Sequence, residues 1–312
     1  RRLHTSRDSH HLEIQLTQAA MSTEHTDPRY EDLDAWPTLK AVEAMWQGQV
    51  DATAVVKAAL PAIAAAADAA AARLGQNGRL IYCGAGTSGR IAVQDGAELL
   101  PTFGWPSERT MFALAGGQGA LIAAVEDAED NSADGAGQIN DANAGPDDVV
   151  IGVSASGSTP FTLGAIHAAK GRGALTIGIA SNRASVLLDA ADHPVLIETG
   201  SEVLSGSTRM KAGTAQKIVL NLFSTAVMIR LGRVYKGLMV DMVPTNAKLR
   251  KRAVKMVADI AGVTFEEAEK ALRIGGNIKT AVLVAAGLNL EEAKSRLAAA
   301  GGNLRIALKS GR

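Results

Sequence analysis

Residues 80–90 run Leu80-Ile-Tyr-Cys-Gly-Ala-Gly-Thr-Ser-Gly-Arg90, an apolar stretch that passes into a loop rich in glycine and hydroxyl side chains. Four more short apolar runs follow, each succeeded by small polar residues and then by a segment of helical length. The five runs are Leu80–Cys83, Thr110–Ala115, Val149–Val153, Leu175–Ala180 and Pro194–Ile197. Short strands that alternate with helices predict βαβ units and a parallel sheet covered on both faces.

The segments outside these runs are predicted to be helical. Apolar residues recur at helical spacing within 32–74 and again within about 211–231. Farther on, Thr264–Glu267 and Asn289–Glu292 have the pattern of capping boxes that begin helices. We therefore expect three parts: a flexible leader over 1–28, an α/β domain with N-terminal helices over 29–245, and a small helical C-terminal domain over 246–312.

The composition narrows the class of protein. The 312 residues hold 32 Lys and Arg against 32 Asp and Glu, so the formal net charge is zero. This balance removes the electrostatic case for a nucleic-acid or anionic-membrane partner. The single cysteine, Cys83, allows neither an internal disulfide nor a zinc site. We expect a cytoplasmic protein with no membrane span and no signal peptide in 1–20, and Met21 precedes sequence more typical of an ordinary start.

Two hydroxyl-rich loops follow the first and third predicted strands. Ligands of an open parallel sheet bind beyond the carboxyl ends of the strands, where the strand order reverses. Glycine amides, hydroxyls and a helix start together suit a phosphate monoester. Each loop alone could be an N-cap loop, but two at the same switch point favour phosphate binding. The candidate residues are Thr87, Ser88 and Gly89 in the first loop and Ser154, Ser156, Gly157, Ser158 and Thr159 in the second.

Two further sequence patterns near these loops each allow more than one interpretation. The first loop matches G-x-G-x-x-G, but Ala115-Gly-Gly-Gln118 replaces the acidic residue that a dinucleotide-binding unit has after its second strand. A third stretch, Ser205–Lys211, precedes the predicted long helix. Its Ser207 and Lys211 are candidate phosphate-binding residues, or its cations merely cap and solvate the loop.

At these residues the sequence resembles sugar isomerase (SIS) domains, and more closely the N-acetylmuramic acid 6-phosphate etherases. The resemblance extends from about residue 30 to the C-terminus. It is carried by Gly84–Arg90, Ala128–Asp130, Ser154–Pro160, Ser207–Lys217, Leu238–Asp241, Thr245, Asn246 and Lys248. It implies a three-layer αβα sandwich with a five-stranded parallel sheet in flavodoxin-like order. It also implies a homodimer without a cofactor that cleaves the lactyl ether of N-acetylmuramic acid 6-phosphate to N-acetylglucosamine 6-phosphate and D-lactate, in peptidoglycan recycling.

The resemblance implies two catalytic glutamates, which match Glu98 and Glu129. Ring opening would make C1 an aldehyde and acidify the proton on C2, so that one carboxylate removes this proton while a protonated carboxyl donates to the departing lactate oxygen. Water then adds at C3 with the roles reversed. Two carboxyls in different protonation states suffice, and the sequence has no cluster with metal-ligand spacing. The residues leave open which glutamate is the base.

The two glutamates differ in their surroundings. Glu129 lies in an acidic run that could also be a solvated helix face. Ten helical residues between Ser88 and Glu98 would span roughly 15 Å, more than a hexose phosphate bridges comfortably. Either the helix ends early at Gly96, or Glu98 serves a site shared with the partner subunit, and we favour the shared site.

Two other functions could use the same phosphate cradle. One is a non-catalytic SIS regulator that senses a sugar phosphate, and the other is an aldose–ketose isomerase with a single base. No helix-turn-helix domain is appended, and both candidate glutamates are present, so the etherase is the favoured hypothesis.

Overall fold

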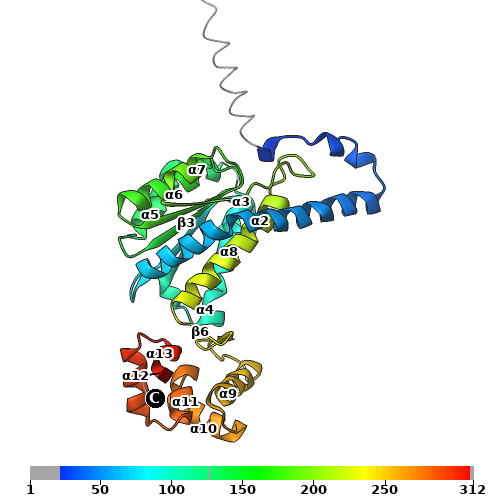
Figure 1. Ribbon diagram of the computed structural model, residues 1–312. Coiled ribbons are helices and arrows are strands. Elements are labelled where there is room, and N and C mark those ends of the chain that lie inside the picture. The colour runs from blue at the N-terminus through cyan, green and yellow to red at the C-terminus, as the bar shows by residue number, and fades with distance from the viewer. Residues whose placement is uncertain (1–21, 126, 310–312) are drawn as a thin grey trace, which may run out of the picture. The chain divides into compact units, whose positions relative to one another are not determined.

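The computed structural model describes residues 22–125 and 127–309 (Figure 1). The described residues form two compact units, one that runs to Gly96 and resumes over 110–223, and one made of 97–109 and of the residues from Ser224 onward. This division differs from the boundary expected at 245. In the second unit the Arg233 guanidinium donates to the carbonyls of Phe103 and Gly104, both at 2.9 Å, so residues 97–109 associate with the C-terminal part of the chain.

The first unit contains the predicted sheet. Its strands are β1 (Leu80–Gly84), β2 (Thr110–Leu114), β3 (Val149–Val153), β4 (Leu175–Ala180) and β5 (His193–Leu196). All are parallel and lie in the order β2-β1-β3-β4-β5, which confirms the flavodoxin-like order and places the reversal between β1 and β3. β1, β3 and β4 are buried along their whole length, as expected of central strands covered on both faces.

Helices cover both faces of this sheet (Figure 1). They are α2 (Thr38–Leu74), α3 (Gly86–Ala97), α5 (Ser132–Asp141), α6 (Pro160–Gly171), α7 (Val186–Ala190) and the long α8 (Lys211–Arg230). One core lies between the sheet and α5, α6 and α7, with Phe161 and Ile166 packed against Ile81 and Val150. α2 covers the opposite face (Figure 1). It begins at Thr38, later than the sequence pattern suggested, because Pro37 precedes it.

Short 3₁₀ segments connect these elements. They are η1 (Ser22–Glu24), η2 (Pro28–Tyr30), η3 (Leu33–Ala35), η5 (Gln118–Leu121) and η6 (Ala128–Asp130). Most of the predicted flexible leader, residues 1–21, lies outside the described residues. Residues 22–28 differ from the expectation, because Thr23 in η1 is fully buried.

The second unit has its own apolar core, and its helices are the appended helices predicted from the sequence. Both predicted capping boxes are formed, with Thr264 and Asn289 as the N-cap residues. The elements are α4 (Leu99–Phe103), η4 (Ser107–Arg109), β6 (Val234–Tyr235), β7 (Leu238–Met239), α9 (Ala247–Ala261), α10 (Phe265–Gly275), α11 (Ile278–Ala285), α12 (Leu290–Ala299) and α13 (Leu304–Lys309).

By length and composition alone, α2 and α8 could cross a membrane, contrary to the expectation that no segment would qualify. The core helices of soluble proteins meet the same criteria. In α8, 56% of the most apolar window is buried inside the protein. The criterion therefore gives only weak support for a membrane span.

An ion pair connects the starts of β1 and β3. The Asp148 carboxylate accepts hydrogen bonds from the Arg79 backbone N–H at 2.9 Å and from Arg79 Nη2 at 2.6 Å, and Gly145 N–H donates to it as well. Burial acts to raise the pKa of Asp148, but these hydrogen bonds outweigh it and hold the pKa below its ordinary value of 3.8.

We expect Asp148→Asn to lower the free energy of unfolding at pH 7 by about 2–4 kcal/mol. Because the folded-state pKa is depressed, the carboxylate stabilises the fold above pH 3.8, and this stabilisation is lost as the pH falls through the folded-state pKa. Denaturant unfolding of both proteins between pH 7 and pH 3 measures the difference, which should shrink towards pH 3. A difference that stays constant over this range would contradict the assignment.

Candidate active site

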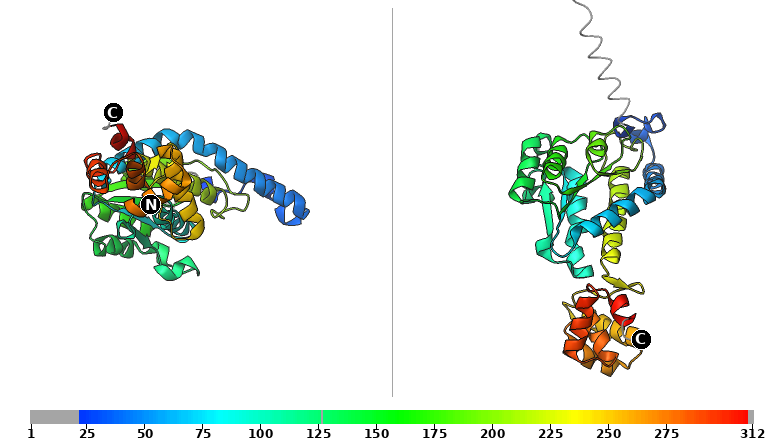
Figure 2. Two further views of the ribbon diagram at one scale, coloured as in Figure 1. Left: turned by 90° about the horizontal axis from the view of Figure 1, so that it is seen from below. Right: turned by 60° about the vertical axis from the view of Figure 1, so that its left-hand side comes forward.

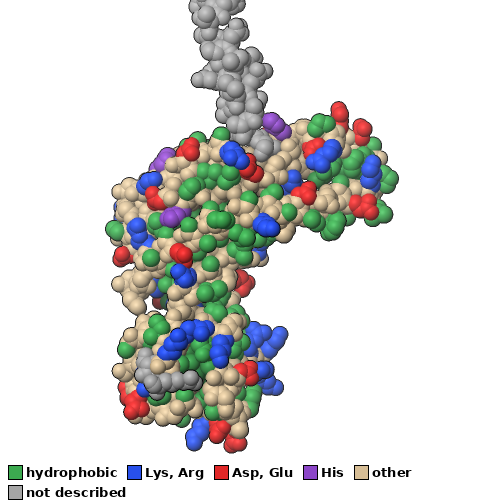
Figure 3. Space-filling view, in the orientation of Figure 1, with side chains coloured by type: hydrophobic (Ala, Val, Ile, Leu, Met, Phe, Trp, Pro, Cys, Tyr) green, Lys and Arg blue, Asp and Glu red, His purple; other side chains and the backbone are tan. Residues whose placement is uncertain are grey.

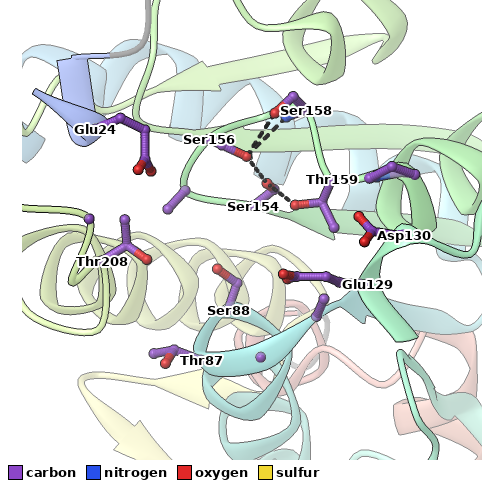
Figure 4. Close-up of a pocket in the computed structure, with 15 residues that line it drawn as sticks. Glu24, Thr87, Ser88, Glu129, Asp130, Ser154, Ser156, Ser158, Thr159 and Thr208 are labelled. Atoms are coloured by element: carbon purple, nitrogen blue, oxygen red, sulfur yellow. Dashed lines mark hydrogen bonds between the residues drawn. The ribbon is translucent and has the colours of Figure 1, made fainter. Parts of the chain in front are cut away.

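A cavity of about 640 Å³ opens at the carboxyl ends of β1 and β3, where the strand order reverses (Figure 4). Four segments line it: the β1–α3 loop, the β3–α6 loop, η6 and the loop before α8. The N-terminal η1 adds one more side chain, that of Glu24. Hydroxyls and carboxylates predominate among the lining side chains, and none of the described residues that line the cavity is a lysine or an arginine.

The β3–α6 loop forms an internally hydrogen-bonded set of hydroxyls. Ser154 Oγ lies 2.8 Å from Thr159 Oγ1 and accepts from the Gly157 N–H at 3.0 Å. Ser158 donates to Ser156 Oγ from its backbone N–H at 3.2 Å and from its hydroxyl at 3.1 Å. The four hydroxyl residues line the cavity, so the structure brings them together as the sequence suggested.

Gly157 shapes this loop without lining the cavity. Its φ of +72° is a left-handed conformation that favours glycine, and a Cβ built on it would lie 2.3 Å from Ser185 Cβ. The loop can therefore turn tightly over Ser185 only with a glycine at this position.

The first turn of α3 supplies Gly86, Thr87 and Ser88 to the cavity wall. α3 begins here, so the positive end of its dipole and its free N–H groups lie at the cavity. The Ser88 hydroxyl donates to Gln216 Oε1 of α8 at 3.0 Å. Gly89 does not line the cavity; a Cβ on it would lie 2.3 Å from Leu114 Cδ1, so glycine lets α3 approach the sheet.

The third hydroxyl-rich stretch contributes different residues from those expected. Gly206 and Thr208 line the cavity, whereas Ser207 and Lys211 do not. Lys211 is buried, and its ammonium donates to the Ser201 carbonyl at 2.9 Å. The Glu202 carboxylate accepts from the Lys211 and Ala212 N–H groups at the start of α8. This helix start is therefore capped by a protein carboxylate.

In the part of the chain that the structure describes, three carboxylates face the cavity (Figure 4). Glu129 and Asp130 come from η6, and Glu24 comes from η1. Glu24 is not among the residues predicted for the site, because it falls in the segment that was expected to be a flexible leader. Among the described residues, no group of three or more His, Cys, Asp or Glu side chains is placed to hold a metal ion. Burial raises the pKa of Cys83 to about 12, so this thiol stays protonated at neutral pH.

Comparison of this sequence with known proteins shows the family to which the chain belongs. Residues 62–170 match the glucokinase regulatory protein N-terminal SIS domain, and residues 129–226 match the SIS domain. An N-acetylmuramic acid 6-phosphate etherase of Deinococcus radiodurans is 49% identical over 291 residues, which cover 93% of this chain and 95% of that protein. This chain belongs to the N-acetylmuramic acid 6-phosphate etherase family.

The sequences of other N-acetylmuramic acid 6-phosphate etherases support this family assignment. The relative from Rubrobacter xylanophilus is 47% identical over 93% of this chain and 96% of its own length, and that from Cutibacterium acnes is 46% identical over 92% and 95%. The chain is therefore an enzyme of the etherase family. The regulator alternative rested on the same phosphate-binding loops and is not favoured by these relatives.

In this etherase-family chain the two candidate glutamates lie in different places. Glu129 lines the cavity, whereas Glu98 is exposed, follows the C-terminal end of α3 and does not line it. α3 continues past Gly96 and ends at Ala97, directly before Glu98. At 1.5 Å per residue, the ten residues from Ser88 to Glu98 span roughly 15 Å.

Proposed function

We propose that this protein cleaves the lactyl ether of N-acetylmuramic acid 6-phosphate and releases D-lactate and N-acetylglucosamine 6-phosphate. The observation that carries the proposal is the position of Glu129, whose carboxylate faces the same cavity as the four hydroxyls of the β3–α6 loop. A phosphate held by these hydroxyls and by the N-terminus of α3 would place the sugar within this cavity.

The reaction proceeds by elimination and then hydration. With the sugar ring open, a carboxylate takes the C2 proton, the C3–O bond breaks, and the lactate oxygen leaves with a proton from a carboxylic acid. Water then adds its hydroxyl to C3 of the resulting alkene, and C2 regains a proton. The net change is hydrolysis of the ether, and it needs two carboxyls that exchange protonation states.

The second carboxyl, Glu98, comes from the partner subunit of a homodimer in this proposal. Supporting this, Glu98 is not among the residues that line the cavity of its own chain. An exposed apolar stripe on α2 supports a second copy as the occupant: Leu39, Val42, Trp46 and Val50 are 71%, 49%, 64% and 41% exposed. They recur at helical spacing on the part of α2 that projects away from the sheet (Figure 2), where Figure 3 shows exposed hydrophobic side chains.

A cytoplasmic location completes the proposal. The buried, unpaired Cys83 suits a reducing compartment, as does a phosphorylated sugar substrate.

A D-lactate assay of the full chain on N-acetylmuramic acid 6-phosphate tests this function. We expect D-lactate and N-acetylglucosamine 6-phosphate in equal amounts. N-acetylmuramic acid without the phosphate should give far less product, because no phosphate group would then bind the β3–α6 loop and the N-terminus of α3. Tight binding of N-acetylglucosamine 6-phosphate without any lactate release would overturn the enzyme and favour a sugar-phosphate sensor.

A further inference from the structure

We propose that Glu24 orients the sugar: its carboxylate accepts a hydrogen bond from a hydroxyl or amide N–H of the bound sugar phosphate. The inference deepens the proposed function and depends on it for the identity of the sugar. Glu24 and Glu129 lie on opposite sides of the cavity, with the hydroxyls of Ser154 and Ser156 between them (Figure 4). A sugar held through its phosphate would therefore have one acidic side chain on either side.

Hydrogen bonds attach the segment that carries Glu24 to the loop after β4, which contains Asn182, and to the loop before α8, which contains Ser205. Thr23 is fully buried, and its N–H donates to Asn182 Oδ1 at 3.4 Å. Asn182 Nδ2 in turn lies within 3.1 Å of both Thr23 Oγ1 and the Ser156 carbonyl. On the other side, the Ser205 hydroxyl donates to the Glu24 carbonyl at 3.1 Å. The contacts of Thr23 with Asn182 and of Glu24 with Ser205 join residues more than 150 apart in the sequence, and they hold the Glu24 backbone in place.

The carboxylate of Glu24 has no protein partner among the described residues. Its backbone carbonyl accepts from Ser205, but the side chain makes no ion pair there, and no lysine or arginine lines the cavity. Gly206 adjoins it with a φ of +73°, and a Cβ on this glycine would lie 3.3 Å from Glu24 Oε2. Glycine at this position therefore leaves room beside the carboxylate.

The chemistry of a carboxylate limits what it can bind. An ionised carboxylate only accepts hydrogen bonds, and it repels a phosphate. Glu24 would therefore weaken a bare phosphate site, so its role lies with the neutral donors of the substrate. Sugar hydroxyls and the acetamido N–H are such donors, and a charged acceptor makes stronger hydrogen bonds with them than a neutral one does.

Calorimetric titrations with N-acetylglucosamine 6-phosphate and with inorganic phosphate distinguish binding of the sugar from binding of the phosphate group. For Glu24→Ala we expect affinity for N-acetylglucosamine 6-phosphate to fall about 10- to 100-fold, while affinity for inorganic phosphate is unchanged within about twofold or increases. Glu24→Gln keeps an acceptor oxygen and should lose less. Glu31→Gln, an exposed carboxylate in the same segment that does not line this cavity, serves as the matched control and should leave both affinities unchanged.

A second variant tests whether the attachment acts through Glu24. Thr23→Val removes the hydroxyl that accepts from Asn182, so it should weaken sugar-phosphate binding, yet add little to Glu24→Ala in the double variant. Equal losses with both probes would indicate a damaged cradle, and a loss with neither would show that Glu24 does not touch the sugar; either result overturns the inference. If the wild-type protein binds the sugar phosphate but releases no lactate, the proposed function fails while the binding comparison still decides the role of Glu24. A wild-type protein that binds neither probe overturns both.

Discussion

Glu129→Gln should lower kcat for D-lactate release by about 10²- to 10⁴-fold, the usual loss when a general acid or base is removed. The amide has nearly the shape of the carboxyl but can neither accept nor donate the proton that the reaction transfers. Because the phosphate cradle is unchanged, KM and the affinity for N-acetylglucosamine 6-phosphate should change little. Steady-state lactate assays on wild type and variant, together with a product-binding titration, measure both quantities.

Asp127→Asn is the matched control for this substitution. Asp127 is exposed, lies two residues before Glu129 and does not line the cavity. Its φ of +62° is one that asparagine accepts readily, so the backbone of this turn should persist. We expect near-wild-type turnover from the control. Comparable turnover from Glu129→Gln would return Glu129 to the solvated surface and leave the proposed mechanism without its base or acid in this cavity.

Glu98→Gln and Glu129→Gln, each inactive alone, should regain activity when one subunit of each variant forms a heterodimer. Each cavity of the proposed homodimer uses Glu129 of one subunit and Glu98 of the other. In a heterodimer of Glu98→Gln and Glu129→Gln, one cavity then holds both intact glutamates, and the other holds neither. Heterodimers purified by two different tags should have about half the wild-type activity, and a random equal mixture about a quarter.

The outcome separates a shared site from one built within a single chain. Heterodimers no more active than their two parents would show that Glu98 acts in its own subunit or not at all. A monomer in sedimentation analysis would contradict the shared site directly. As a control, doubly substituted Glu98→Gln/Glu129→Gln paired with wild type leaves no cavity with both glutamates intact, so this heterodimer should be nearly inactive.

Much of the fold could be predicted because its signals are local. The strands β1, β3 and β4 are short, mainly apolar runs, and each is followed within two residues by glycine or serine, so their predicted bounds match the structure within a residue. The hydroxyls of the β3–α6 loop follow their strand directly, so the switch point of the sheet suffices to bring them to the cavity. The capping boxes at Thr264 and Asn289 are likewise closed within four residues.

Only the tertiary structure decided the features that depend on long-range contacts. Thr23 is buried against Asn182, 159 residues away, and this contact brings Glu24 to the cavity although its own sequence context has the polar character of a leader. Lys211 follows the serine-rich loop in sequence, but its ammonium donates a hydrogen bond to the Ser201 carbonyl, and Glu202 caps the start of α8. Arg233 binds the carbonyl of Phe103, 130 residues earlier, and so moves the unit boundary. Strand runs, loops and caps follow from the preferences of neighbouring residues, whereas these contacts depend on which distant groups the assembled sheet and helices bring within hydrogen-bonding distance.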